Sequence, residues 1–79
     1  STEDEIVEDI YKITMLKKLS KEIERIGDPR EKAIIMMRYG LDGTKPMTQL
    51  EVSKKLNISR SYVSRIEKKT LRDLRKRME

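Results

Sequence analysis

The sequence predicts an all-α fold, a single small domain of four helices. Its 79 residues are enough for one compact domain and too few for two. Charged residues make up 42% of the chain against 35% hydrophobic and 4% aromatic, and the aromatic residues are three Tyr. The core must therefore be thin and aliphatic, which in short Lys- and Glu-rich chains is typical of helices.

The first two helices are predicted from apolar periodicity and from their end signals. Residues 3–26 contain neither Pro nor Gly, and their apolar residues recur at steps of three or four, so they form one long helix. Gly27 is expected to end this helix as its C′ residue. A second helix follows over residues 29–39, with Asp28 as its N-cap and Gly40 at its end.

The remainder of the chain predicts a helix-turn-helix over residues 48–77. Thr48 and Glu51 form a capping box that opens a short helix ending near Leu56. Ser59 is the expected N-cap of the last helix, after a turn of about three residues. The apolar residues that should fix the crossing of these two helices are Val52, Leu56, Ile58, Val63 and Ile66.

The composition excludes most enzymes. The chain has no Cys and no His, so it lacks thiol nucleophiles, zinc-binding thiolates and the commonest general base. No enzymatic activity, metal or cofactor is therefore expected. No apolar run reaches the length of a membrane span, and we expect a soluble, intracellular protein. Because the chain begins at Ser1 rather than Met, we also expect it to be a piece of a longer protein.

The positive charge belongs to the C-terminal part of the chain. The formal net charge is +5, but residues 1–28 hold five basic and eight acidic residues, whereas residues 29–79 hold fourteen and six. Residues 59–79 alone hold eight basic residues against three acidic ones. A positive surface of this kind attracts polyanions, and nucleic acid is the commonest polyanion in a cell.

The polar face of the last predicted helix suits the major groove of DNA. Ser61 and Ser64 are short enough for a close approach, and Arg60 and Arg65 can reach guanine O6 and N7. Phosphate contacts are expected from residues at helix N-termini and from later basic residues, namely Thr48, Gln49, Ser59, Lys68 and Arg72. Each residue taken alone also has an ordinary role as a cap or a solvated charge. Together they fit one geometry.

Two strings of residues resemble a known family. Residues 36–42 read Met-Met-Arg-Tyr-Gly-Leu-Asp, and residues 56–68 read Leu-Asn-Ile-Ser-Arg-Ser-Tyr-Val-Ser-Arg-Ile-Glu-Lys, with Thr48 and Gln49 between them. In this order they resemble region 4 of bacterial RNA polymerase sigma factors, over residues 16–77. The second string is most similar to the sporulation-type alternative sigma factors.

The resemblance implies a cytoplasmic bacterial domain that binds the minus-35 element of double-stranded promoter DNA and docks on the β flap of RNA polymerase. It implies a monomer, with anti-sigma or activator proteins as further partners. The base-reading positions that it implies are Arg60, Ser61 and Arg65, with Lys69 as a further candidate. The backbone-contact positions are Thr48, Gln49, Ser59 and Ser64. Housekeeping sigma factors commonly carry an acidic residue where Ser61 stands and Gln where Arg65 stands, so their base sequence does not carry over.

The resemblance also implies an apolar groove for the polymerase flap, with Ile34, Met36 and Met37 as candidate lining residues. Two alternatives stay open at this point. The chain can be a protein-interaction module that docks polymerase or a regulator, because its acidic first helix and Met-rich second helix suit partner binding. It can also be a repressor-type helix-turn-helix domain, which would need a dimer and a pseudo-palindromic site.

Overall fold

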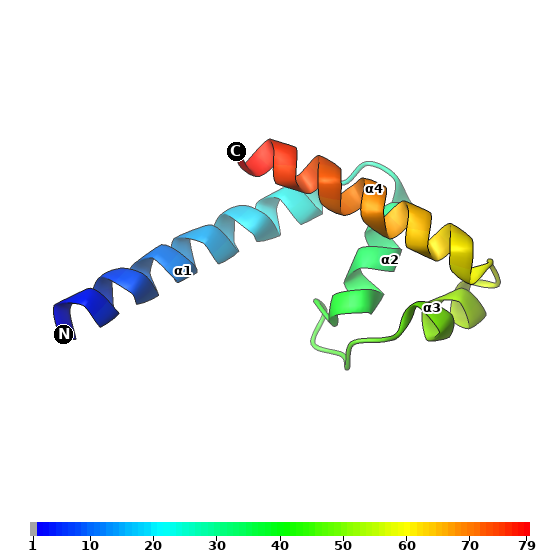
Figure 1. The fold of residues 1–79 in the computed structure, drawn as a ribbon, viewed down its shortest axis with the longest axis horizontal. Helices are drawn as coiled ribbons and strands as arrows, with labels where there is room; N and C mark the ends of the chain where they lie inside the picture. Colours follow the sequence, from blue (N-terminus) through cyan, green and yellow to red (C-terminus); the bar gives the residue numbers. More distant parts are fainter. Residues whose placement is uncertain (1) are drawn as a thin grey trace.

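The all-α fold is confirmed. The computed structural model describes residues 2–79 and contains helices but no strand over this range (Figure 1). In chain order the helices are α1 (Thr2–Glu24), α2 (Pro29–Tyr39), α3 (Gln49–Leu56) and α4 (Arg60–Met78).

The end of α1 differs from the prediction. The helix stops at Glu24 rather than at Ile26, and Gly27 does not adopt the left-handed conformation expected of a C′ residue. The backbone N–H of Arg25 donates to the carbonyls of both Lys21 and Glu22, at 3.2 Å each, so the last turn tightens. This early exit places Ile26 in the core together with Ile23.

The other helix ends follow the local signals. The Asp28 carboxylate caps α2, the Thr48–Glu51 capping box opens α3, and Ser59 caps α4 by accepting from the backbone N–H of Tyr62 at 3.1 Å. Gly40 ends α2 in the left-handed conformation with φ of 60°.

The helix α4 organises the fold, because it packs against each of the other three helices. Figure 1 shows the C-terminal half of α4 beside the end of α1 and its N-terminal half crossing α2 and α3. The 23 residues of α1 extend for about 35 Å. Its first half projects away from the other helices, which accounts for the longest dimension of 49 Å.

Two small apolar clusters hold these helices together. The first joins α1 to the end of α4 through Ile23, Ile26 and Leu74. The second joins α2, α3 and α4 through Ile34, Val52 and Val63, each with 0% of its surface exposed. Fully burying a side chain of this size stabilises the fold by about 1.5 to 3 kcal/mol. The second cluster therefore fixes the position of α4 relative to α3.

The helices of residues 2–79 are all too short or too polar to cross a lipid bilayer.

Candidate nucleic-acid interface

The turn between α3 and α4 is built from three residues with distinct tasks. Asn57 adopts the left-handed conformation, with φ of 56°, and reverses the chain after α3. Ile58 is half-buried and packs on the second apolar cluster, and Ser59 caps α4. The predicted inner residues Leu56 and Ile66 pack on the same cluster. This packing forces the opposite side of α4 to face outward.

The outward side of α4 carries the residues that the sequence analysis assigned to DNA contact. Arg60, Ser61 and Arg65 are exposed, and Ser64 is half-buried between them. Val63, which lies next to Ser64 in the chain, is completely buried. The helix thus divides into an apolar side that packs on α3 and a polar side that is open to a ligand. We call the polar side, made of Arg60, Ser61, Ser64 and Arg65, the outer face of α4.

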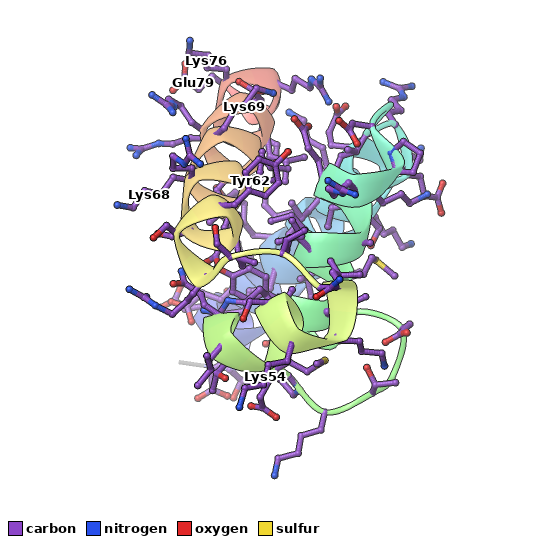
Figure 2. The ribbon with its side chains drawn as sticks, turned by 90° about the vertical axis from the view of Figure 1, so that its right-hand side faces the viewer. Lys54, Tyr62, Lys68, Lys69, Lys76 and Glu79 are labelled. Atoms are coloured by element: carbon purple, nitrogen blue, oxygen red, sulfur yellow. The ribbon has the colours of Figure 1, made fainter. Side chains whose placement is uncertain are left out.

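Basic residues extend this face along the helix. Lys68 and Arg72 are exposed and form no hydrogen bond or ion pair with residues 2–79. Figure 2 shows Lys68 and Lys76 pointing away from α4 into solvent. The guanidinium carbon of Arg65 lies 5.6 Å from the centre of the Tyr62 ring, a cation–π contact that orients this arginine on the outer face.

Lys69 differs from the other candidate base-reading residues. Its Nζ donates to Glu31 of α2 at 2.7 Å and to Asp73 at 3.4 Å. The hydrogen bond to Glu31 is the largest cause of a raised pKa for Lys69, followed by the bond to Asp73. The ammonium group of Lys69 is therefore bound by two carboxylates. Lys69 could read a base only by giving up these two contacts.

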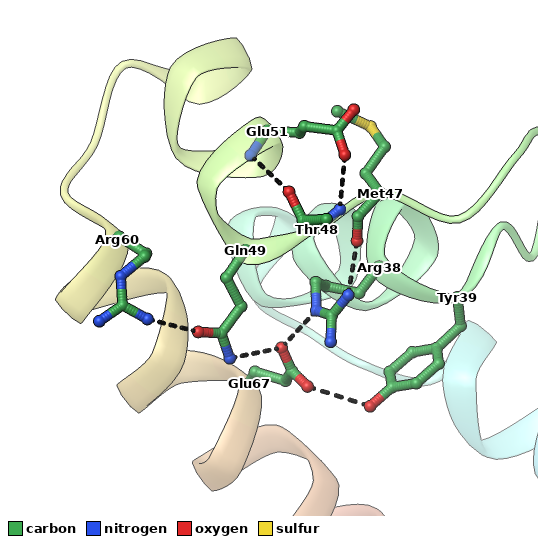
Figure 3. Close-up of polar contacts among 8 residues, drawn as sticks. All are labelled: Arg38, Tyr39, Met47, Thr48, Gln49, Glu51, Arg60 and Glu67. Carbon is green, nitrogen blue, oxygen red and sulfur yellow. Dashed lines mark hydrogen bonds and ion pairs between the residues drawn. The ribbon is translucent and has the colours of Figure 1, made fainter.

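Thr48, Gln49 and Ser59 lie at the N-termini of α3 and α4, as the sequence predicts. The Thr48 hydroxyl is used as an N-cap, accepting from the backbone N–H of Glu51 at 3.1 Å. The Gln49 side chain reaches across to α4, where its Oε1 accepts from an Nη of Arg60 at 3.2 Å (Figure 3). This contact brings the start of α3 and the start of α4 together.

A buried carboxylate that was not predicted from the sequence links α2, α3 and α4. Glu67 has only 7% of its surface exposed. Its Oε1 accepts from Nε of Arg38 at 2.7 Å and from Nε2 of Gln49 at 3.3 Å, and its Oε2 accepts from the Tyr39 hydroxyl at 3.0 Å (Figure 3). Arg38 also donates to the carbonyl of Met47. The helical spacing could have identified the buried carboxylate, because Glu67 lies four residues after Val63 and therefore on the buried side of α4.

The acid dependence of stability should report on Glu67. Burial alone raises the pKa of this carboxyl, but the hydrogen bonds from Arg38, Tyr39 and Gln49 together lower it below its ordinary value. Its stabilising contribution is therefore complete above the ordinary glutamate pKa of about 4.3 and is lost as the pH falls through the lower pKa of the folded state.

We expect the free energy of unfolding, measured by urea denaturation at a series of pH values, to fall below about pH 4.3 more steeply in the parent chain than in Glu67→Gln. The amide cannot titrate, so its curve should be flatter. Equal acid dependence in the two proteins would contradict this account of the buried carboxylate.

An apolar groove of about 330 Å³ lies on a different part of the domain. Its walls come from α1, α2, the loop after α2, and α4. The lining residues are Leu19, Ile23, Ile35, Tyr39, Leu41, Leu71 and Leu74. None of the residues of the outer face of α4 lines it. These lining residues could not be grouped from the sequence, because the walls of the groove come from segments far apart in the chain.

The candidate docking residues separate into two kinds. Ile34 has no exposed surface and belongs to the second apolar cluster, so it is a core residue rather than a groove residue. Met36 and Met37 are half-buried and pack on the first and second clusters respectively. Neither lines the apolar groove, to which α2 contributes Ile35 and Tyr39 instead. Over the described part of the chain, no group of acidic residues is placed to hold a metal ion.

Known proteins resemble this chain over most of its length. The family described as "Sigma-70, region 4" matches residues 28–76. The RNA polymerase sigma-K factor of Bacillus subtilis (strain 168) is 49% identical over 70 residues, which are 89% of this chain and 24% of that protein. The RNA polymerase sigma-28 factor of Bacillus thuringiensis subsp. kurstaki is also 49% identical over 70 residues, which are 30% of its length.

The RNA polymerase sigma-E factor of Clostridium acetobutylicum is 51% identical over 47 residues, which are 60% of this chain and 20% of that protein. The chain thus spans between a fifth and a third of the length of these relatives. No solved structure shows a significant match to it.

Proposed function

The chain belongs to the sigma-70 region 4 family, and from this premise we propose that it binds the minus-35 element of promoter DNA as part of a sigma factor. In this role it directs bacterial RNA polymerase in transcription initiation. The observation that carries the proposal is the division of α4, whose buried Val63 side fixes an outer face of Arg60, Ser61, Ser64 and Arg65 in the open. A helix with this exposed face enters the major groove with its N-terminal turns.

The residues divide into two kinds of contact. Arg60 and Arg65 carry donor pairs that match guanine O6 and N7, while Ser61 and Ser64 keep the helix surface low enough for close approach. Lys68 and Arg72 contact phosphates, and the N-termini of α3 and α4 add backbone N–H donors near Thr48 and Ser59. Phosphate contacts supply affinity, and base contacts supply sequence preference.

The apolar groove supports a second contact, with the flap of the polymerase β subunit. Its lining is almost entirely apolar side chains from α1, α2 and α4, and it shares no residue with the outer face of α4. An apolar helix of a partner suits a groove of this kind. A domain with these two separate surfaces can hold polymerase while α4 stays available to DNA.

Selection from a pool of randomised DNA duplexes tests the proposal, because it identifies a preferred sequence without assuming one. We expect Arg60→Ala to lose discrimination at one guanine, at a cost of about 1 to 3 kcal/mol in binding free energy. Lys68→Ala should instead weaken binding to all duplexes alike and reduce the slope of log affinity against log salt by about one. The measurement is fluorescence anisotropy over a salt series.

An unchanged preference in Arg60→Ala would show that this residue does not read a base. Amide-shift mapping separates DNA binding from a role in protein interaction alone. DNA binding predicts localised changes at residues 59–69 when duplex is added, and a protein-interaction module predicts none.

A further inference from the structure

Glu67 is the residue of α4 that the DNA contacts leave unexplained. It is an acidic residue in a basic helix, and a carboxylate buried this far needs strong partners. It has them on two other helices: Arg38 and Tyr39 donate from α2, and Gln49 donates from α3. Figure 3 shows these side chains converging on the carboxylate and Arg60 lying on the far side of Gln49.

The carboxylate determines which way the Gln49 amide points. An ionised carboxylate only accepts hydrogen bonds, so Gln49 must turn its NH₂ group toward Glu67. Its carbonyl oxygen then points the other way, toward Arg60, which donates to it at 3.2 Å. The reversed amide would set its oxygen against the carboxylate and its NH₂ against the guanidinium, so both contacts would be lost. The hydrogen bond from Arg60 to Gln49 therefore depends on the amide orientation that Glu67 imposes.

We propose that Glu67 is a positioning residue for DNA reading, which acts through Gln49 to hold the Arg60 guanidinium at the start of α4. The inference rests on the proposed function. Arginine is long and flexible, and a side chain ordered before the ligand arrives loses less conformational entropy on binding. Arg38 supplies the charge that keeps Glu67 ionised inside the domain, since its Nε is 2.7 Å from the carboxylate.

The same arrangement assigns Gln49 a different task from the one that the sequence suggested. Its amide is engaged on both sides, by Glu67 and by Arg60. Its side chain thus bridges α3 and α4, and its contribution to phosphate binding comes from its place at the N-terminus of α3.

The test measures a ratio of two affinities: the affinity for the preferred duplex divided by the affinity for the duplex in which the guanine read by Arg60 is replaced. We expect Glu67→Gln to lower this ratio by about threefold to tenfold. In the double variant with Arg60→Ala, the ratio should be no lower than in Arg60→Ala alone, because Glu67 acts through Arg60. If Glu67 had only a structural role, Glu67→Gln would lower the melting temperature but leave the ratio measured on the folded protein unchanged.

Two matched controls accompany the variant. Glu24→Gln removes the same charge from an exposed position at the end of α1, and Ile26→Val weakens the first apolar cluster. Both should keep the ratio of the parent chain. Where Glu67→Gln does not fold, Gln49→Leu breaks the link to Arg60 while leaving the Arg38–Glu67 ion pair in place, and it should lower the ratio in the same way.

The outcomes are distinct. A parent chain with sequence preference and a Glu67→Gln ratio equal to that of the parent would overturn the positioning role alone. The positioning role would also be overturned if the double variant had a lower ratio than Arg60→Ala alone. A parent chain with no preference among duplexes would overturn the proposed function, and this inference with it.

Discussion

Replacing Gly40 by alanine is expected to lower the free energy of unfolding by about 2 to 4 kcal/mol. Gly40 ends α2 with φ of 60°, a conformation that side chains other than glycine rarely adopt. An added Cβ would also collide with the backbone carbonyl oxygen of Thr44, and a backbone atom cannot move away as a flexible side chain can. The loop would have to shift, and with it Met47, whose N–H donates to the carbonyl of Met37 at 3.0 Å.

The other two glycines provide matched controls for this variant. Gly27 has no positive φ and open space around its Cβ position, so Gly27→Ala should leave stability unchanged or raise it by up to about 1 kcal/mol. Gly43 has φ of 86° but no neighbour within 4 Å, so Gly43→Ala isolates the backbone strain from the clash. Urea denaturation followed by circular dichroism measures all three. Equal losses in Gly40→Ala and Gly43→Ala would show that the clash contributes nothing.

Ile34→Ala is expected to have the second large effect, a loss of about 2 to 5 kcal/mol. Ile34 has no exposed surface, and its contacts with Val52 and Val63 join α2 to both helices of the helix-turn-helix. Small domains are stable by only about 5 to 15 kcal/mol, so a loss of this size should lower the melting temperature of the variant markedly in thermal denaturation. Because Val63 anchors α4, binding to DNA should weaken with stability.

Ile13→Ala is the control, since Ile13 lies on the projecting half of α1 with 53% of its surface exposed. It should change stability by no more than about 0.5 kcal/mol. If Ile34→Ala kept the stability of the parent chain but lost polymerase binding, Ile34 would be a docking residue after all, and its assignment to the core would be wrong.

The helix starts were the features most accessible to sequence reasoning. Asp28, Thr48 and Ser59 each accept a backbone hydrogen bond within three residues, so the signal and the structure it produces lie in the same short segment. The left-handed residues Gly40 and Asn57 are local in the same sense.

The end of α1 shows where local reasoning failed. Gly27 is a good C′ residue by type, and the apolar spacing continues to Ile26, so the sequence predicts a longer helix. The structure ends α1 at Glu24 because Ile26 packs with Ile23 and with Leu74 of α4. Leu74 is distant in the chain, and no signal within residues 3–28 reports that contact.

The pairing of charged residues in the candidate site also could not be predicted from local sequence. Composition marks Glu67 and Lys69 as ordinary members of a charged helix, yet Glu67 is buried against Arg38 and Lys69 is paired with Glu31. Each pairing depends on how α2 lies against α4. Exposure of Ser61 and Arg65, by contrast, follows from the apolar spacing of α4 itself, since residues opposite Val63 must face outward.

The sequence by itself determined the all-α class, the helix starts and the outward side of α4, because caps and helical periodicity act between residues one to four positions apart. Only the tertiary structure decided where α1 ends, that Ile34 is core, which groove lies between α1, α2 and α4, and that Glu67 orients Gln49. These features depend on contacts between helices that are remote in the chain. Their energies are set by burial and by paired charges, which no short segment encodes.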